Sequence, residues 1–237
     1  MPLVAGIDSS TQSCKVVIRD AISGELVRSG RASHPAGTEV DPNAWFEALE
    51  VAIADAGGFS DVSAVSIGGQ QHGMVLLDQD GRVIRKALLW NDTRSASTAT
   101  ELIEHFGAEY LVKNTGSIPV ASFTSTKVLW VARNEPENAS RIAAVCLPHD
   151  WLSWRLAGYG PAGESQLGPD FSALATDASD ASGTGYFNPV TGEYLDEIWQ
   201  FILGRMPVLP KIVKPGEWAY APDEGTHFGI ACGAGDN

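Results

Sequence analysis

Residues 6–20, GIDSSTQSCKVVIRD, contain the pattern that decides the fold. An apolar run from Leu3 to Ile7 meets Asp8, a hydroxyl-rich turn follows, and a second run of strand-forming residues ends at Asp20. This pattern predicts two neighbouring strands joined by a short turn, and residues 25–33 predict a third strand directly after them. The chain therefore begins with three successive strands of a sheet.

Helices and strands alternate after this start. The clearest helix is expected to begin after Asp41, a favourable N-cap residue, with Pro42 in its first turn, and to end at Gly57. Further helices are expected over 95–106, 124–133, 150–156 and 195–203, strands over 62–69, 143–150 and within 227–237, and a hairpin over 73–90. The stretch 157–186, rich in Gly, Ser and Asp, indicates a long surface excursion or a flexible insertion. An antiparallel start followed by this alternation predicts an α/β domain with a mixed sheet.

Composition limits the class of partner. The 237 residues suffice for one large domain or two small ones, and 16 Lys and Arg against 29 Asp and Glu give a net charge of −13. Such a charge argues against nucleic acid and against an anionic membrane surface. The N-terminus lacks the features of a signal peptide, and no apolar run is long enough to span a membrane. The three cysteines lie far apart and indicate buried thiols in a reducing cytoplasm.

Four polar clusters follow predicted strands, at the ends where open α/β sheets bind ligands. They are GIDSST (6–11), GGQQHG (68–73), LLWNDTR (88–94) and GAGDN (233–237), the last of which is interpreted as a glycine turn that ends the apolar strand before it. In the first cluster, Asp8 can hold hydrated Mg²⁺, while Ser9, Ser10 and Thr11 can offer donors to a phosphate. The alternative is a turn in which these side chains only shape the hairpin.

The other three clusters also allow two interpretations each. Gln71 and His72 can bind hydroxyl groups of a ligand, or can belong to a solvated loop. The stretch from Trp90 to Arg94 has the composition of a sugar site, but equally fits a structural Asp–Arg pair with Asp92 or Thr93 capping a helix. Asp236 can serve as a general base, or can be a loop carboxylate that caps a following helix.

Taken together, the clusters resemble the FGGY carbohydrate kinases, closest to those that phosphorylate D-xylulose. SFTSTKVLWVARNEP (122–136) is similar to the first signature of that family, with Lys127, Trp130 and Asn134 in register. LPHDWLSWRLAG (147–158) and ATDASDASGTGYFN (175–188) follow in the family's order, and GAGDN resembles the start of its second half. The resemblance implies the ribonuclease H-like, actin-type ATPase fold, in which two lobes close on a cleft. Residues 1–237 would then be the N-terminal, sugar-binding lobe.

The resemblance also implies roles for individual residues. Asp236 would take the proton from the terminal hydroxyl of a ketopentose as that oxygen attacks the γ-phosphate of ATP. Gln71, His72 and Asn237 would bind the sugar, while Asp8 would position Mg²⁺ and the turn from Ser9 through Ser10 to Thr11 would bind phosphate. The implied partners are the pentulose, ATP and a C-terminal kinase lobe, with a homodimer allowed. Without that second lobe, the chain is expected to be inactive.

Three rival interpretations stay open at this point. Another member of the same family would act on ribulose, gluconate or glycerol, although His72 stands where the glycerol kinases have Arg-Glu. A sugar-binding or regulatory module would use the same fold without catalysis. A ribonuclease H-type nuclease would need several carboxylates around two metals, and the charge of −13 counts against it.

Overall fold

The N-terminal hairpin forms as expected in the computed structural model, which describes residues 2–222 and 226–236. Its three strands are β1 (Leu3–Ser9), β2 (Ser13–Asp20) and β3 (Leu26–Ser33). The two pairings are antiparallel, with Ser9 opposite Cys14 in one and Val16 opposite Gly30 in the other. Alternate residues such as Ala5, Ile7 and Val16 are buried, as the period of two in the sequence requires.

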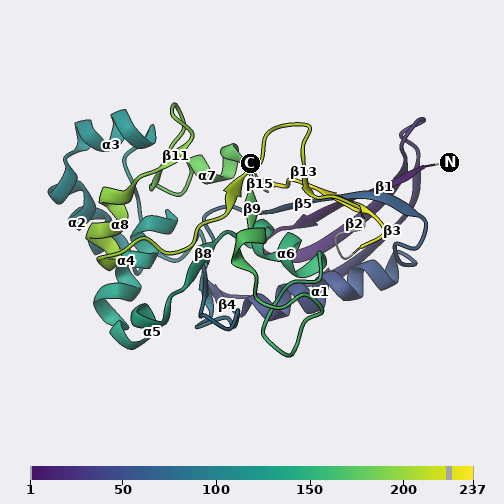
Figure 1. Ribbon diagram of the computed structural model, residues 1–237, viewed down its shortest axis with the longest axis horizontal. Helices are drawn as coiled ribbons and strands as arrows, with labels where there is room; N and C mark the ends of the chain where they lie inside the picture. The colour runs from purple at the N-terminus through teal and green to yellow at the C-terminus, as the bar shows by residue number, and fades with distance from the viewer. Residues whose placement is uncertain (1, 223–225, 237) are drawn as a thin grey trace.

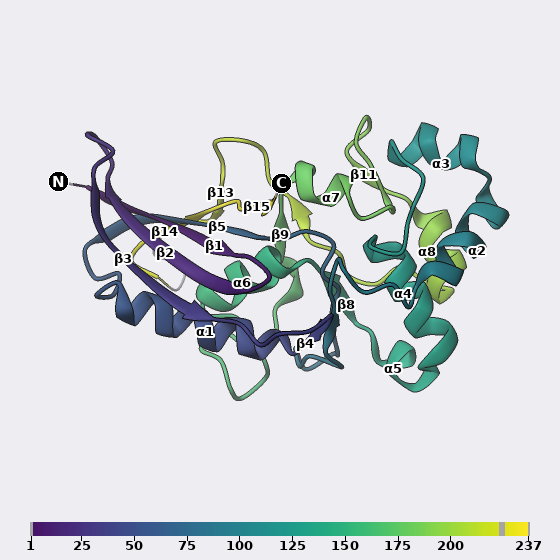
Figure 2. The ribbon, with the colours of Figure 1, turned by 180° about the vertical axis from the view of Figure 1, so that it is seen from behind.

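The main sheet has seven strands and is mixed (Figures 1 and 2). Its further members are β5 (Val62–Gln70), β13 (Trp218–Tyr220), β14 (Gly229–Ala231) and β15 (Ala234–Asp236). The order is β13-β14-β5-β1-β2-β3, and β15 continues along β5 beyond β14. β5 is parallel to β1, β14 and β15. β5 is therefore the strand that joins the N-terminal hairpin to the last part of the chain.

Two helices pack on one face of this sheet, α1 (Pro42–Asp55) and α6 (Pro148–Leu156). Asp41 caps α1 as predicted, because its side chain accepts a hydrogen bond from the backbone nitrogen of Asn43. A Cβ atom at Gly30 would lie 2.2 Å from the carbonyl oxygen of Ala52, so only glycine lets β3 approach α1 this closely. One large apolar cluster fills the space between the sheet and these helices.

A second apolar cluster lies at the other end of the elongated molecule, among helices (Figure 1). These helices are α2 (Ala96–Phe106), α3 (Ala108–Thr115), α4 (Thr124–Asn134), α5 (Pro136–Arg141) and α8 (Asp196–Leu203). Trp199, Leu129 and Leu102 are among its buried side chains. Three of the helices agree with the sequence prediction, whereas α3 and α5 were not predicted.

Short elements connect the two parts. They are β4 (Glu39–Val40), β6 (Val75–Leu77), β7 (Ala87–Leu88), β8 (Ala144–Cys146), the 3-10 turn at Phe171–Ala173, β9 (Ala175–Thr176), α7 (Ala178–Ser182), β10 (Phe187–Asn188), β11 (Glu193–Tyr194) and β12 (Lys211–Ile212). The chain reverses at Asp80-Gly81 as expected for the hairpin over 73–90, with backbone hydrogen bonds from Asp78 to Arg82 and from Ile84 to Leu76, while β6 also pairs with β8. The strand expected over 143–150 ends early, and α6 begins at Pro148.

Two sequence predictions near the C-terminal end are corrected by the structure. The stretch 157–186 is not an excursion throughout, because Leu174, Asp180 and Tyr186 are buried. GAGDN is not a glycine turn, because 234–236 form β15 and pair with β5. Among the described residues, no helix is both long enough and apolar enough to cross a membrane. Cys14 and Cys146 are buried and Cys232 is half-buried, and all three are free thiols.

Candidate active site

Three parallel strands end side by side at one edge of the main sheet. Ser9 of β1 lies opposite Gly69 of β5, and Asp236 of β15 lies opposite Gln70. The end of β5 therefore lies between the two segments that the sequence marked as phosphate turn and catalytic base. The side chain of Asp236 and all of Asn237 lie outside the described residues, so the register of the Asp236 backbone is the structural information on this pair.

The last two residues of β1 face opposite sides of the sheet: Ser9 is buried and Asp8 is exposed. A Cβ atom at Gly69 would lie 2.9 Å from the backbone nitrogen of His149 in α6, which shows that Gly69 and its neighbour Ser9 face that helix. Asp8 alternates with Ser9, so it lies on the opposite, exposed face of the sheet.

The hydroxyl residues of this turn are held from both sides. The carbonyl oxygen of Ser10 is 2.8 Å from Nδ1 of His34, and the Ser10 hydroxyl donates to the carbonyl of Ser13 at 3.5 Å. Oγ1 of Thr11 accepts a hydrogen bond of 3.0 Å from Nε1 of Trp90. The turn is thus shaped by its own side chains, while the exposed Asp8 carboxylate stands beside it.

The predicted sugar loop follows β5 directly. His72 has a φ of 63°, in the left-handed region that a non-glycine residue seldom adopts. Its ring stacks on Phe123, with 5.1 Å between the ring centroids, and is half-buried rather than fully solvated. Burial lowers the pKa of His72, and the positive charge of Lys127 lowers it further. The imidazole is therefore held neutral, in the form that can both donate and accept hydrogen bonds.

The WNDTR stretch forms a structural ion pair. Asp92 is 5% exposed, and its carboxylate accepts hydrogen bonds from the Thr38 hydroxyl at 2.8 Å and from Nε of Arg94 at 2.9 Å. Arg94 also pairs with Glu39 at 2.7 Å. The capping part of the prediction was wrong, because Ser95 is the N-cap residue of α2. Within this stretch, only Trp90 reaches the predicted phosphate turn by a hydrogen bond that the structure describes.

A buried group of charges lies beneath β15, and the sequence did not indicate it. Nε2 of His149 is 3.2 Å from Asp150, 3.1 Å from Asp180 and 3.5 Å from Asp177. Burial alone would lower the pKa of His149, but these carboxylates outweigh it and raise the pKa to about 9. His149 is therefore a buried cation at neutral pH. In the sequence these residues stand in PHD (148–150) and DASD (177–180). Both look like ordinary helix-capping motifs as long as the packing of the two segments is unknown.

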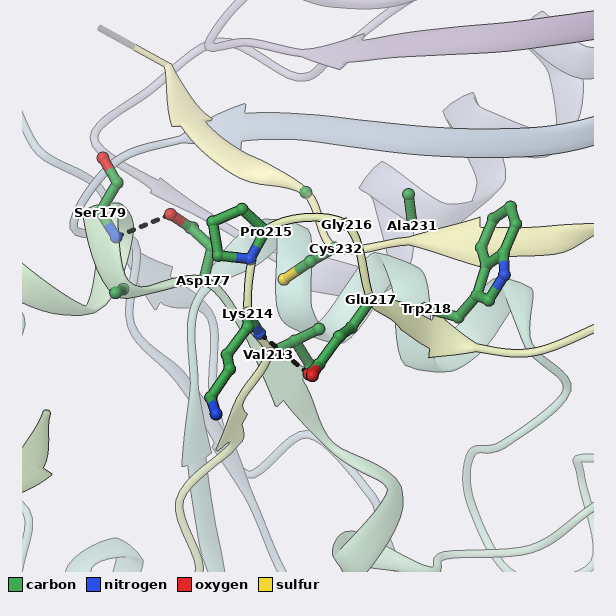
Figure 3. Close-up of a pocket in the computed structure, with 12 residues that line it drawn as sticks. Asp177, Ser179, Val213, Lys214, Pro215, Gly216, Glu217, Trp218, Ala231 and Cys232 are labelled. Atoms are coloured by element: carbon green, nitrogen blue, oxygen red, sulfur yellow. Dashed lines mark hydrogen bonds between the residues drawn. The ribbon is translucent and has the colours of Figure 1, made fainter.

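A pocket of about 560 Å³ lies beside the same strand (Figure 3). It is lined by Asp177, the N-cap residue of α7, by Ser179 of α7, and by Lys214, Trp218 and Cys232, the last of which lies where β14 leads into β15. The loop 213–218 is fixed by a hydrogen bond of 3.3 Å from the Lys214 backbone to Glu217. Residues 213–218 thus form one wall of a pocket next to the strand that ends in Asp236.

Residues 3–229 match the family model described as "FGGY family of carbohydrate kinases, N-terminal domain". The chain belongs to this family. The resemblance seen in the sequence is therefore confirmed, and so is the expected fold, a mixed α/β lobe that matches the N-terminal lobe of FGGY kinases with their actin-like ATPase fold.

Two FGGY relatives align with the whole chain, and a third aligns with 40% of it. It is 43% identical to the xylulose kinase of Streptomyces rubiginosus over 248 residues, which is 100% of this chain and 49% of the relative. It is 75% identical to a xylulose kinase sequence of 96 residues from Arthrobacter sp.. The crystal structure of xylulose kinase from Bifidobacterium adolescentis superposes with a TM-score of 0.93 at 48% identity, covering 100% of this chain and 54% of that one. The chain thus spans about half the length of these larger FGGY kinases.

The donor set at this edge of the sheet fits magnesium bound with few protein ligands. No group of three or more His, Cys, Asp or Glu side chains in the described ranges, 2–222 and 226–236, is arranged to enclose a metal ion. Asp8, by contrast, is exposed and lies opposite Gly68 in the parallel pairing of β1 with β5. Mg²⁺ prefers such sites, with one or two carboxylates, several waters and the phosphates of the substrate.

Proposed function

We propose that the protein that contains this FGGY lobe phosphorylates D-xylulose, transferring the γ-phosphate of ATP to the terminal hydroxyl of the sugar. The observation that carries the proposal is the register at β5, which brings the backbone of Asp236 beside the strand that leads into Gln71 and His72. The relatives that are 43% and 48% identical over the whole chain are named xylulose kinases, which supports this choice of sugar.

Asp236 acts as the general base in this proposal. Its carboxylate accepts the proton of the sugar hydroxyl as the hydroxyl oxygen forms its bond to the γ-phosphorus. The bond from that phosphorus to the β,γ-bridging oxygen breaks, and ADP leaves with the electron pair. Phosphoryl transfer depends mostly on positioning and on charge neutralisation, and a positioned base adds about 10²- to 10⁴-fold.

Gln71 and His72 bind the sugar, and Asn237 assists them. A neutral imidazole and an amide can each donate one hydrogen bond and accept another, which suits the hydroxyl groups of a pentulose. The stacking of His72 on Phe123 limits the positions of its ring, so binding loses less side-chain entropy. The left-handed backbone at His72 turns the chain away from β5 at this point.

Asp8 holds magnesium in this proposal, and the turn from Ser9 through Ser10 to Thr11 contacts phosphate. When bound, the ion would neutralise charge on the phosphates of ATP. The exposed Asp8 carboxylate supplies the protein ligand, and the backbone of the turn offers N–H groups. The enzyme needs its C-terminal lobe for ATP, and it acts in the cytoplasm, where ATP is present.

Activity of the full-length protein tests the proposal. ADP release is measured with D-xylulose, D-ribulose, D-gluconate and glycerol as acceptors, and the largest kcat/KM is expected for D-xylulose. Asp236→Ala is expected to lower kcat at least about 100-fold while sugar binding stays within a few-fold, because the base acts in the chemical step. Asp196→Asn, at an exposed carboxylate that begins α8, is the matched control.

Three outcomes would contradict parts of this proposal. A larger kcat/KM for another acceptor than for D-xylulose would show that the protein acts on a different substrate of the family. Sugar binding without any turnover would favour a binding module. Sugar-dependent turnover by residues 1–237 alone, equal to that of the full-length protein, would show that the second lobe is dispensable.

A further inference from the structure

The helix α7 lies against β15, the strand that ends in Asp236 (Figures 1 and 2). It carries Asp180, whose side chain is 1% exposed. One carboxylate oxygen of Asp180 is 3.1 Å from Nε2 of His149, which comes from α6 and is equally buried. A carboxylate and an imidazolium from two helices thus meet beneath a strand that belongs to the candidate active site.

Each side chain of this pair points one polar atom at the backbone of β15 or of Gly233 just before it. A Cβ atom at Gly235 would lie 2.7 Å from Oδ1 of Asp180, and one at Gly233 would lie 2.7 Å from Nδ1 of His149. Neither Oδ1 nor Nδ1 has a hydrogen-bond partner among the described residues. Close packing on Asp180 therefore explains Gly235, whereas a side chain at Gly233 would meet the carbonyl oxygen of Ile67 in β5 at 2.0 Å before it meets His149.

The same contact includes the sugar loop. The Cβ position of Gly235 also lies 2.8 Å from Cγ of Gln71, and a Cβ atom at Gly183, directly after α7, would lie 2.8 Å from Cε1 of His72. The segment from Asp180 to Gly183 thus touches both the strand of the predicted base and the loop that follows β5. A shift of this segment would change the distance between them.

We propose that Asp180, paired with His149, is a positioning residue that holds β15 against the Gln71–His72 loop and so sets the place of Asp236 relative to the sugar. This inference rests on the proposed function, because it assigns a role within that site. Asp180 itself touches no substrate in this account. It acts through β15 and through the loop.

The charge of the pair is what holds the segment in place. Asp150 and Asp177 also face His149, so this imidazolium is surrounded by carboxylates and cannot move away without leaving them unpaired. Removing His149 leaves these buried carboxylates uncompensated, and removing the charge of Asp180 takes away the carboxylate that also contacts β15 at Gly235, so either change lets the surrounding segments shift. A displacement of about 1 Å at a catalytic group can lower the rate about 100-fold.

The test compares isosteric variants of the full-length enzyme. Asp180→Asn keeps the shape and removes the charge, and it is expected to lower kcat about 10- to 100-fold with less than about a threefold change in the Kd for D-xylulose. His149→Gln is expected to act in the same direction. The double variant is expected to be no slower than Asp180→Asn alone, because the two side chains work as one unit.

Asp170→Asn is the matched control. Asp170 is exposed, and its side chain accepts hydrogen bonds from the backbone nitrogen and the hydroxyl of Ser172, at 2.9 and 2.6 Å. Asparagine retains the acceptor oxygen, so this variant removes a nearby negative charge outside the group of carboxylates around His149. Its kcat is expected to stay within about threefold of wild type.

Hydrogen exchange gives a readout that does not depend on the substrate. The amides of 233–236 are expected to exchange at least about tenfold faster in Asp180→Asn than in wild type, while those of β14 stay unchanged. If the wild-type protein does not phosphorylate D-xylulose, the proposed function fails but this difference still supports the positioning role. Unchanged exchange together with kcat within threefold of wild type would overturn it.

A folding defect does not remove the test. Should Asp180→Asn fail to fold, Gly235→Ala keeps every buried charge and places a methyl group against the Asp180 carboxylate. It is expected to show the same loss of kcat and the same faster exchange of the 233–236 amides; because the methyl group also meets Cγ of Gln71, the Kd for D-xylulose is not a readout for this variant. A Gly235→Ala enzyme with wild-type kcat would contradict the proposal, as would an Asp180→Asn enzyme whose Kd rises as much as its kcat falls.

Discussion

The Nζ atom of Lys127 donates a hydrogen bond of 2.8 Å to the backbone carbonyl oxygen of His72. Lys127 is completely buried in α4, and burial lowers its pKa to about 7, although the charge of Asp92 acts in the opposite direction. The Thr124 hydroxyl donates to the same carbonyl at 3.4 Å. Two side chains of one helix thus fix the residue whose backbone is in the left-handed region.

Lys127→Met in the full-length protein tests this brace. Methionine retains the length of the side chain but donates no hydrogen bond, so the His72 carbonyl loses its shorter partner. The carbonyl retains only the 3.4 Å hydrogen bond from Thr124, and a lost hydrogen bond contributes about 0.5–1.5 kcal/mol, so we expect the Kd for D-xylulose to rise roughly 2- to 10-fold. Sugar titration by calorimetry measures the effect, and Lys113→Met, at an exposed lysine of α3, is the control. Equal Kd values for both variants would disprove the role.

Stability should depend on pH through His149. Its pKa is about 9 in the folded chain and about 6.5 when unfolded, because Asp150 on its own helix and Asp177 and Asp180 on α7 favour the cation. The folded state then binds more protons between these values, so this contribution is complete below about pH 6.5 and is lost as the pH rises through 9.

The measurement is the difference in free energy of unfolding between wild type and His149→Gln. We expect the wild-type advantage to shrink by up to about 3 kcal/mol between pH 6.5 and 9.5, at ~1.4 kcal/mol per pKa unit. Taking the difference removes the opposing trend of Lys127, which is present in both proteins. An advantage that grows with pH would refute the assignment of a buried cation.

Local signals were sufficient for the first half of the fold. The alternation in β1 and β2 and the caps of α1 lie within the segments themselves, so the sequence predicted them closely. The 5-residue helix α7 has no apolar period, and it forms because Asp177 caps it and Asp180 is buried against neighbours. Glycines made 233–236 look like a turn, but pairing with β5, a partner far away in the sequence, makes 234–236 a strand.

The sequence predicted which residue types form the candidate site, but not the buried side chains that hold these residues in place. Asp8, Gln71 and His72 were recognised because polar residues after apolar strands stand out. Charged residues such as His149 and Asp180 are usually expected in solvent, and only the packing of two helices under β15 shows that they are buried. The contact from Lys127 to His72 likewise needs the tertiary structure.

Asp92 is predicted to matter for stability and not for sugar binding. Its buried carboxylate accepts hydrogen bonds from Thr38 and Arg94, and Arg94 lies over the ring of Trp130 at 5.2 Å. Asp92→Ala leaves the Thr38 hydroxyl without its acceptor and leaves Arg94 paired with Glu39 alone, so it should lower the free energy of unfolding by about 1–3 kcal/mol. Urea unfolding of the full-length protein measures this, with Asp80→Ala, at an exposed aspartate, as the control. A normal unfolding midpoint with a raised KM for sugar would show the reverse assignment.

Thr11 is predicted to contact the phosphates of ATP through its hydroxyl. Its Oγ1 accepts a hydrogen bond of 3.0 Å from Trp90, so its own O–H group is free in direction to donate to a phosphate oxygen. Hydrogen bonds to charged groups contribute about 1.5–3 kcal/mol, so Thr11→Val should raise the KM for ATP at least about tenfold, and leave the KM for D-xylulose unchanged.

Trp90→Phe tests how much the hydrogen bond from Trp90 contributes to positioning the Thr11 hydroxyl for its contact with phosphate. The variant removes the donor but keeps the Thr11 hydroxyl, so we expect the KM for ATP to rise only about two- to threefold. Thr100→Val, at an exposed threonine of α2, controls for loss of a hydroxyl elsewhere. Steady-state kinetics with each substrate varied in turn gives both constants. If Thr11→Val changed the two KM values equally, the turn would only support the hairpin, and the phosphate contact would have to lie with Ser9 or Ser10.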